Sequence, residues 1–186
     1  MGVAYVGINF YPHSKRFYKQ TMSLDKLPTM TAKKVGIFVD APLEEVIKTA
    51  ELHHLDMIQL HGNESAVYCE LLKKHFPVIK AFQGNLAIES SILSDYDMCD
   101  YYLFDSALGK HAGLGMAFDH TVLENYHFDK PYFLAGGLGS DFFDKTFQKS
   151  LYPGLYGLDL NSKFELSPGL KDLELIASFI IKTQNQ

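Results

Sequence analysis

Two short apolar runs with an amphipathic segment between them constrain the fold of this chain more than any other feature. The runs are residues 35–39 (VGIFV) and 57–60 (MIQL). The apolar residues between them recur at helical spacing: Leu43, Val46, Ile47 and Ala50. A strand that is apolar on both faces needs helices covering both, which is typical of a parallel sheet. This stretch therefore predicts a strand–helix–strand unit.

Apolar runs of the same kind return along the whole chain, roughly every 20 to 30 residues, which is the length of a βα repeat. They begin near Val3, Val35, Met57, Val78, Tyr101, Tyr132 and Tyr156. A repeated right-handed βα unit forms either a doubly wound open sheet or a closed eightfold barrel. The sequence has no dinucleotide-binding glycine fingerprint, and polar residues follow the runs. We predict an α/β fold of the (β/α)8 TIM-barrel type with seven readable strands, in one domain over residues 1–186.

Composition and charge exclude several classes of protein. With 47% apolar residues, a chain of 186 residues can bury a substantial core. A formal net charge of −5, without a long basic cluster, argues against a nucleic-acid binder. No apolar run has the length of a membrane span, and the first residues lack signal-peptide features. We predict a cytoplasmic protein that binds neither nucleic acid nor membranes.

The cysteines and histidines do not indicate a metal site. Cys69 and Cys99 are too few for a disulfide framework, which fits a reducing compartment. His53 and His54 are adjacent, so on a helix they point in different directions, and no paired spacing occurs elsewhere. We predict no bound metal, a surface or packing role for both histidines, and a packed core thiol at Cys69.

Two further segments have helical periodicity, and one strand carries a charge. Residues 65–75 predict a helix with Val67, Leu71 and Leu72 inward. A closing helix begins at Asp172 as its N-cap and has these residues on one face: Leu173, Ile176, Ala177 and Ile180. Lys80 interrupts the apolar run VIKAF. Such a lysine either extends to the end of its strand or sits at a ligand site.

The loops after the last two predicted strands have the composition of a phosphate site. In a βα barrel the loops after the strands form the active face, and these two loops commonly hold phosphate. They contain Gly136 and Gly137, and then Asn161 and Ser162. Glycine lets the backbone approach an anion, so that amides donate to it. An ordinary Gly-Gly turn is the alternative, but the joint position of the loops favours phosphate binding.

Three charged residues are candidates for chemistry or recognition. Asp105 ends an apolar strand, which predicts a partly desolvated carboxyl group with a raised pKa, suited to donating a proton. It could instead cap the following turn. Asp159 is a candidate site residue or a buried structural hydrogen-bond partner. Arg16 can clamp a carboxylate bidentately, although lone loop arginines are usually solvated.

Seven segments, taken in order, resemble the phosphoribosylanthranilate isomerase family over nearly the whole chain. They are GINFYPHSKRF, VGIFVDAPLEEV, IQLHGNES, VIKAF, LFDSALGKHAGLGMAFD, LAGGL and GLDLNSKFELSPGLKD. LAGGL alone is a weak signal. The order of IQLHG, FDSALGKHAGLGMAFD and DLNSKFELSPG is specific.

The resemblance implies a cofactor-free isomerase of tryptophan biosynthesis. Its reaction is the Amadori rearrangement of N-(5-phosphoribosyl)anthranilate to 1-(2-carboxyphenylamino)-1-deoxyribulose 5-phosphate. It implies that Asp105 protonates the furanose ring oxygen and that Arg16 holds the anthranilate carboxylate. The phosphate would lie at the 136–137 and 161–162 loops. Three further residues would shape the site: Gln59, His61 and Asp159.

The sequence departs from the family pattern at three places. Lys163 stands where the family usually has glycine, and Met116 where it usually has lysine. Family members also open with a strand containing Lys-Ile-Cys-Gly and a helix, and that cysteine is the family's general base. We expect this first βα unit to be encoded upstream of Met1, because neither Cys69 nor Cys99 can replace the base.

Three functional hypotheses stay open on the sequence. The first is the isomerase, the second is another phosphosugar-barrel enzyme, such as an epimerase or related synthase, and the third is a non-catalytic remnant that binds a sugar phosphate. All three predict a phosphorylated small molecule as the ligand. The sequence is compatible with a monomer and with a homodimer.

Overall fold

The computed structural model describes residues 2–19, 31–83, 90–105, 123, 129–140 and 151–184. The chain falls into two compact units. The N-terminal unit comprises residues 2–81 and 95–100, and the C-terminal unit comprises residues 82–94 and 101–186. The single-domain organisation stays a prediction.

The N-terminal unit is built on parallel strands that follow one another in sequence order. These are β1 (Tyr5–Asn9), β2 (Lys33–Phe38), β3 (Met57–Leu60) and β4 (Val78–Gln83), of which residues 78–81 belong to this unit. All four residues of β3 are buried, including the polar Gln59. A strand buried on both faces is what the continuous apolar runs predict.

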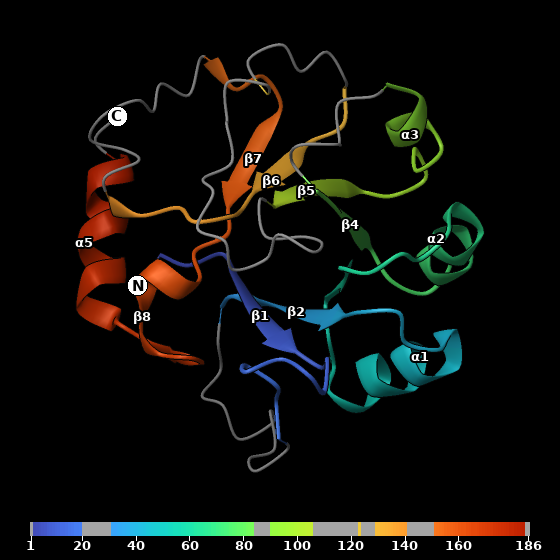
Figure 1. Ribbon diagram of the computed structural model, residues 1–186, viewed down its shortest axis with the longest axis horizontal. Coiled ribbons are helices and arrows are strands. Elements are labelled where there is room, and N and C mark those ends of the chain that lie inside the picture. Colours follow the sequence, from blue (N-terminus) through green and yellow to red (C-terminus); the bar gives the residue numbers. More distant parts are fainter. Residues whose placement is uncertain are drawn as a thin grey trace. The chain divides into compact units, whose positions relative to one another are not determined.

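Two helices of the N-terminal unit lie side by side next to its strands: α1 (Leu43–Leu52) and α2 (Ala66–Lys73) (Figure 1). Two acidic residues stand in the first turn of α1, where they complement the helix dipole. Ser65 caps α2, since its hydroxyl accepts a hydrogen bond from the Tyr68 amide at 3.2 Å. The Ser65 cap fixes where the loop after β3 ends.

The buried stripes of two helices differ from the prediction. In α2, Cys69 and Leu72 are fully buried, whereas Val67 is 65% exposed and Leu71 is 41% exposed. The inward assignment of Val67 and Leu71 was wrong, because a short helix buries only one narrow i, i+3 stripe. In the closing helix, Ile176 and Phe179 are buried, whereas Leu173, at its first turn, is 58% exposed.

The C-terminal unit contains three parallel strands in sequence order, together with α3 (Ser90–Ser94). The strands are β5 (Tyr101–Asp105), β6 (Tyr132–Leu134) and β7 (Leu155–Leu158). Their core is aromatic, with Phe104 packed edge-on against Tyr132 at a centroid distance of 5.2 Å. Both side chains are fully buried. This packing fixes the strand that carries Asp105.

After β7 the chain forms a short 3-10 helix, η4 (Ser162–Phe164), and an antiparallel hairpin of β8 (Glu165–Ser167) and β9 (Leu170–Lys171). The closing helix α5 (Leu173–Gln184) follows. The side chain of Asp172 accepts a hydrogen bond from the Leu175 amide at 2.9 Å, which confirms the predicted N-cap. The sequence analysis did not predict the hairpin.

All seven predicted strands occur, and the α/β class is confirmed. Each begins within two residues of its apolar run, for example at Tyr5 for the run that starts at Val3. Within the described ranges, no helix is both long and apolar enough to cross a membrane.

Candidate active site

The predicted site residues lie at the carboxyl ends of parallel strands or in the loops that follow them. In the N-terminal unit, Arg16 follows β1, Gln59 lies in β3, and His61 comes directly after β3. In the C-terminal unit, Asp105 is the last residue of β5. The other five predicted residues follow β6 or β7: Gly136, Gly137, Asp159, Asn161 and Ser162. Strand ends of this kind form the reactive edge of parallel α/β folds.

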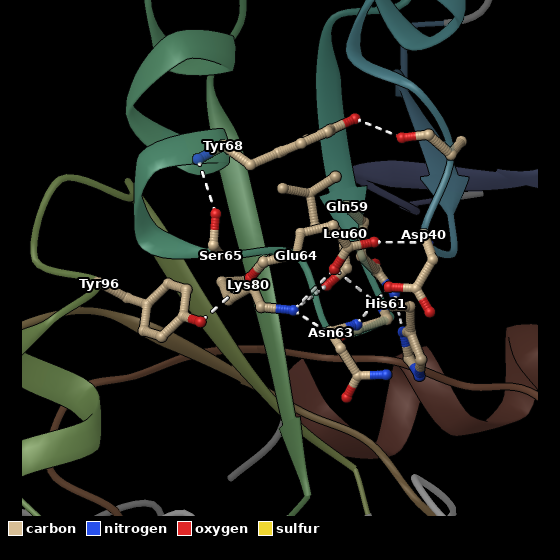
Figure 2. Close-up of polar contacts among 12 residues, drawn as sticks. Asp40, Gln59, Leu60, His61, Asn63, Glu64, Ser65, Tyr68, Lys80 and Tyr96 are labelled. Carbon is tan, nitrogen blue, oxygen red and sulfur yellow. Dashed lines mark hydrogen bonds and ion pairs between the residues drawn. The ribbon is translucent and has the colours of Figure 1, made fainter.

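The structure brings Gln59 and His61 together. Residues two apart on a strand point to the same face, and the amide Nε2 of Gln59 lies 2.8 Å from Nδ1 of His61 (Figure 2). Because an amide nitrogen only donates, Nδ1 is the acceptor in this contact, which corresponds to the ring tautomer with its proton on Nε2. The backbone amide of His61 donates to the carbonyl of Phe38 at 2.9 Å. His61 is therefore held through both its side chain and its backbone.

Lys80 forms a buried ion pair beside this segment. Its side chain is 3% exposed, and Nζ lies 2.8 Å from Oε2 of Glu64, whose side chain is 2% exposed. Nζ also donates to the carbonyl of Gly62 at 2.7 Å. The ammonium group thus reaches the loop after β3, and the sequence analysis missed its partner Glu64. A lysine buried within an apolar strand requires a counter-charge, so the position of Lys80 in the run VIKAF already indicated an acidic partner.

Glu64 ties the loop after β2 to the loop after β3. Its carboxylate accepts hydrogen bonds from the amides of Asp40 at 2.9 Å and Gly62 at 3.1 Å. Asp40 in turn accepts from the amide of Asn63 at 2.6 Å. A Cβ atom on Gly62 would lie 2.4 Å from Oδ1 of Asp40, so only glycine fits there. Figure 2 shows these contacts converging on Glu64.

Two tyrosines brace the same loops. The hydroxyl of Tyr68 donates to the carbonyl of Ala41 at 2.9 Å, and that of Tyr96 donates to the carbonyl of Glu64 at 3.0 Å (Figure 2). Burial, and then the nearby Glu64 carboxylate, raises the pKa of Tyr68 to about 12. Tyr68 therefore remains a neutral donor across the physiological pH range.

Arg16 lies in a loop that folds back along β1. Its amide donates to Oγ of Ser14 at 3.1 Å, and the amide of Tyr18 donates to the carbonyl of Asn9 at 2.7 Å. The Arg16 side chain is half-buried. Its binding of a carboxylate stays a prediction.

Asp105 is half-buried at the end of β5, next to the fully buried Phe104. The neighbouring strand is held close by a hydrogen bond of 2.8 Å from the amide of Ala135 to the carbonyl of Phe104. Residues 106–122, including Met116, lie outside the described residues. The raised pKa of Asp105 stays a prediction.

The glycine pair after β6 has the backbone conformation that glycine permits. Gly136 has φ of 86° and Gly137 has φ of 69°, both in the left-handed region. Gly137 is exposed, and a Cβ atom there would meet nothing within 4 Å. The conformation requires glycine, and the open space beside it leaves room for a ligand.

The loop after β7 is polar, and a lysine from the β8–β9 hairpin contacts it. The amide of Asp159 donates to the carbonyl of Leu134 at 2.8 Å, and Asp159 is half-buried. Asn161 and Ser162 are exposed, and Oδ1 of Asn161 accepts from Nζ of Lys171 at 3.0 Å. Lys171 comes from the unpredicted hairpin, so its presence at this loop could not be found by periodicity.

A family model described as N-(5'-phosphoribosyl)anthranilate (PRA) isomerase matches residues 1–182. The chain belongs to this isomerase family. It is 34% identical to an N-(5'-phosphoribosyl)anthranilate isomerase of Parabacteroides distasonis over 185 residues, covering 97% of this chain and 83% of that protein. It is also 34% identical to the corresponding isomerase of Phocaeicola vulgatus over 183 residues, covering 96% of this chain and 86% of that protein.

Solved structures of the isomerase family share the fold. The phosphoribosyl anthranilate isomerase of Thermus thermophilus superposes with a TM-score of 0.83 at 27% identity, covering 99% of this chain and 89% of its own. Another isomerase was solved with reduced 1-(o-carboxyphenylamino)-1-deoxyribulose 5-phosphate, with a TM-score of 0.77 at 26% identity, covering 98% of this chain and 88% of its own. A third structure, from Thermotoga maritima, contains monomers generated from a dimeric isomerase.

The cysteines and His53 lie in the interior of the N-terminal unit. Cys69 is fully buried and Cys99 is 1% exposed, which confirms Cys69 as a packed core thiol. The hydrogen bond with Cys99 lowers the pKa of the Cys69 thiol. The His53 ring stacks on Phe10 at 5.3 Å, whereas His54 is exposed, so the predicted packing and surface roles are confirmed.

Proposed function

We propose that this chain catalyses the Amadori rearrangement of N-(5-phosphoribosyl)anthranilate to 1-(2-carboxyphenylamino)-1-deoxyribulose 5-phosphate, an isomerisation in tryptophan biosynthesis. The observation that carries the proposal is the family match over residues 1–182. The relative solved with a reduced form of that product has the same fold. The family match favours this reaction over that of another phosphosugar-barrel enzyme.

Asp105 is the proposed general acid. Protonation of the furanose ring oxygen lets the bond between that oxygen and C1 break, while the anilino nitrogen forms a double bond to C1. A half-buried carboxyl group at a strand end can hold the proton that this step consumes. Proton transfer of this kind contributes about a hundredfold to ten-thousandfold in rate.

The proposed anchors of the substrate are Arg16, the loop with Gly136 and Gly137, and the loop with Asn161 and Ser162. A guanidinium group matches the planar anthranilate carboxylate with two parallel hydrogen bonds. Gly136 and Gly137 have positive φ and lie beside open space, which suits donation from backbone amides to the phosphate. Asn161 and Ser162 add exposed polar groups, and Lys171 adds a positive charge beside them.

Gln59, His61 and Asp159 are the proposed residues that shape the site. The Gln59 amide leaves the neutral His61 ring with its proton on Nε2, so that the ring offers a donor away from Gln59. Asp159 is held at the end of β7 by its own backbone bond to β6. These contacts supply orientation, which adds to the general-acid contribution of Asp105.

Removal of the proton from C2 completes the rearrangement and needs a general base. The identity of that base stays a prediction, as do the cytoplasmic location and the oligomeric state.

A direct assay tests the proposed function. N-(5-phosphoribosyl)anthranilate is incubated with the purified protein, and the 1-deoxyribulose 5-phosphate product is followed by chromatography and mass spectrometry. We expect conversion above the uncatalysed rate. Tight binding of the product without any conversion would support the sugar-phosphate-binding remnant instead.

A further inference from the structure

Lys80 is the most deeply buried ammonium group in the described part of the chain, and the proposed mechanism gives it no role. It is 3% exposed, and its partner Glu64 is 5% exposed. A buried ion pair is weak evidence for stability, because desolvation of two charges offsets most of their attraction. The position of the pair, with Lys80 inside β4 and Glu64 in the loop after β3, therefore calls for another explanation.

The pair holds the backbone on both sides of His61. Nζ of Lys80 lies 2.7 Å from the carbonyl oxygen of Gly62 and 3.5 Å from that of Leu60. Oε2 of Glu64 accepts from the amide of Gly62 at 3.1 Å. Because the two bonded carbonyls belong to the residues flanking His61, the ion pair fixes where the His61 Cα lies and where its side chain points.

The pair also locks the neighbouring loop against this segment. Oε1 of Glu64 accepts from the amide of Asp40, which has a left-handed φ of 50°. Asn63 donates back to Asp40 at 2.6 Å. Figure 2 shows Lys80, Glu64 and Asp40 as one connected set beside the Gln59–His61 pair. The set couples the loops after β2 and β3 to strand β4 through one buried charge pair.

We propose that Lys80 is a positioning residue for the isomerase reaction, acting with Glu64 to hold the Gln59–His61 pair in the orientation that meets the substrate. This role rests on the proposed function of the chain. Misplacement of a catalytic or binding group by about 1 Å costs on the order of a hundredfold in rate. Loss of the Lys80 charge is expected to act through His61 and to lower kcat without a matching rise in KM.

The test compares Lys80→Met with Lys73→Met. Lys73 pairs with Asp100 in the same unit, at the amino-terminal end of β4, and both side chains are partly exposed. The same chemical change is therefore made in two ion pairs, only one of which touches the His61 segment. We expect Lys80→Met to lower kcat about a hundredfold, and Lys73→Met to leave kcat within about twofold, since exposed pairs contribute little.

Nitrogen NMR of histidine-labelled protein supplies a second readout, which does not depend on turnover. The His61 signals are assigned from their loss in His61→Gln. We expect the Nε2–H tautomer in the wild type and in Lys73→Met, and a mixture of tautomers in Lys80→Met. If the wild type does not convert the proposed substrate, the function fails, and the His61 signals still decide the positioning role.

The double variant Lys80→Met/Glu64→Leu keeps the test decisive if the single variant does not fold. Replacing both charges by apolar groups avoids an unpaired buried charge, although the amides of Asp40 and Gly62 and the carbonyl of Gly62 lose their side-chain partners. We expect it to be folded, to show the mixed His61 tautomers, and to retain the loss in kcat. Wild-type kcat and wild-type His61 signals in a folded Lys80 variant would overturn the proposal.

Discussion

The two units of the chain fix their strand-end loops in different ways. In the N-terminal unit, buried side chains do so: Lys80 and Glu64 are 3% and 5% exposed and bond the loops after β2 and β3. In the C-terminal unit, the loop after β6 has the positive φ angles of Gly136 and Gly137, and Gly137 is exposed. The Lys80–Glu64 pair is buried, whereas the Gly137 backbone is accessible.

This difference matches the two tasks that the proposed reaction sets. A side chain that must face one ring atom needs its rotamer and backbone held, which buried hydrogen bonds supply. A phosphate needs several donors that can approach closely, which glycine backbone supplies without side-chain bulk. The contrast predicts that substitutions in the buried Lys80–Glu64 pair affect stability and orientation, while those at the glycine pair after β6 also affect ligand affinity.

The largest expected effect comes from unpairing Lys80. Glu64→Gln leaves a buried ammonium group without its counter-charge, which costs about 3–5 kcal/mol of unfolding free energy. The control is Glu165→Gln. The Glu165 side chain is 3% exposed, but its partner Lys171, 3.1 Å away, is 36% exposed and can be solvated once it is unpaired. We expect the control to cost less, about 1 kcal/mol, because no buried charge is left without a partner. Urea unfolding measures both, and equal costs would erase the contrast between the units.

The next effect concerns recognition by Arg16. Arg16→Ala removes a charged hydrogen-bond donor to the anthranilate carboxylate, worth about 1.5–3 kcal/mol. We expect KM to rise about tenfold to a hundredfold while kcat changes little. Lys15→Ala, at the exposed neighbouring position, is the control and should leave KM unchanged. A normal KM in Arg16→Ala would remove the proposed carboxylate clamp.

A smaller effect is expected from the glycine turn. Gly137→Ala places a side chain at φ of 69°, which costs about 1–2 kcal/mol of stability. Gly169→Ala is a matched control in the hairpin turn, with φ of 86° and equally open space around its Cβ. Both variants should lose similar stability, and only Gly137→Ala should raise KM for the phosphorylated substrate. A raised KM in both would show that strain, rather than phosphate contact, causes the change.

The smallest expected effect is a loss of stability at alkaline pH. Because the folded-state pKa of Tyr68 is raised from 10.0 to about 12, the folded state binds its proton more tightly than the unfolded state. This contribution to stability is fully present below pH 10 and is lost as pH rises from about 10 to 12. Tyr68→Phe removes the bond to Ala41, costs about 0.5–1.5 kcal/mol, and should flatten this part of the stability curve. An unchanged alkaline slope would contradict the burial of the Tyr68 hydroxyl.

Much of the scaffold was predictable because hydrophobic periodicity decides where strands and helices form. The strands around Val35, Met57 and Tyr132 occur as predicted, and Asp172 caps the closing helix. The faces of short helices were less predictable. Whether Val67 or Cys69 faces inward depends on the neighbouring helix, and both satisfy an apolar pattern.

The site was predictable in its positions and not in its connections. Strand ends indicated Asp105, and the resemblance indicated Gln59 and His61. Nothing in the spacing shows that Glu64 is the partner of Lys80, because that contact depends on the register of β3 and β4, which places Leu60 opposite Lys80. Lys171 reaches the loop of Asn161 through a hairpin whose short strands carry no periodic signal.

The most direct test of the central claim is the turnover of Asp105→Asn, measured beside the binding of the 1-deoxyribulose 5-phosphate product by calorimetry. The amide keeps the shape of the side chain but holds no acidic proton, so ring opening loses its general acid. We expect kcat to fall about a hundredfold to ten-thousandfold, with the product dissociation constant within about threefold of the wild type. Unchanged kcat in a folded Asp105→Asn protein would contradict the assignment of Asp105 as the acid.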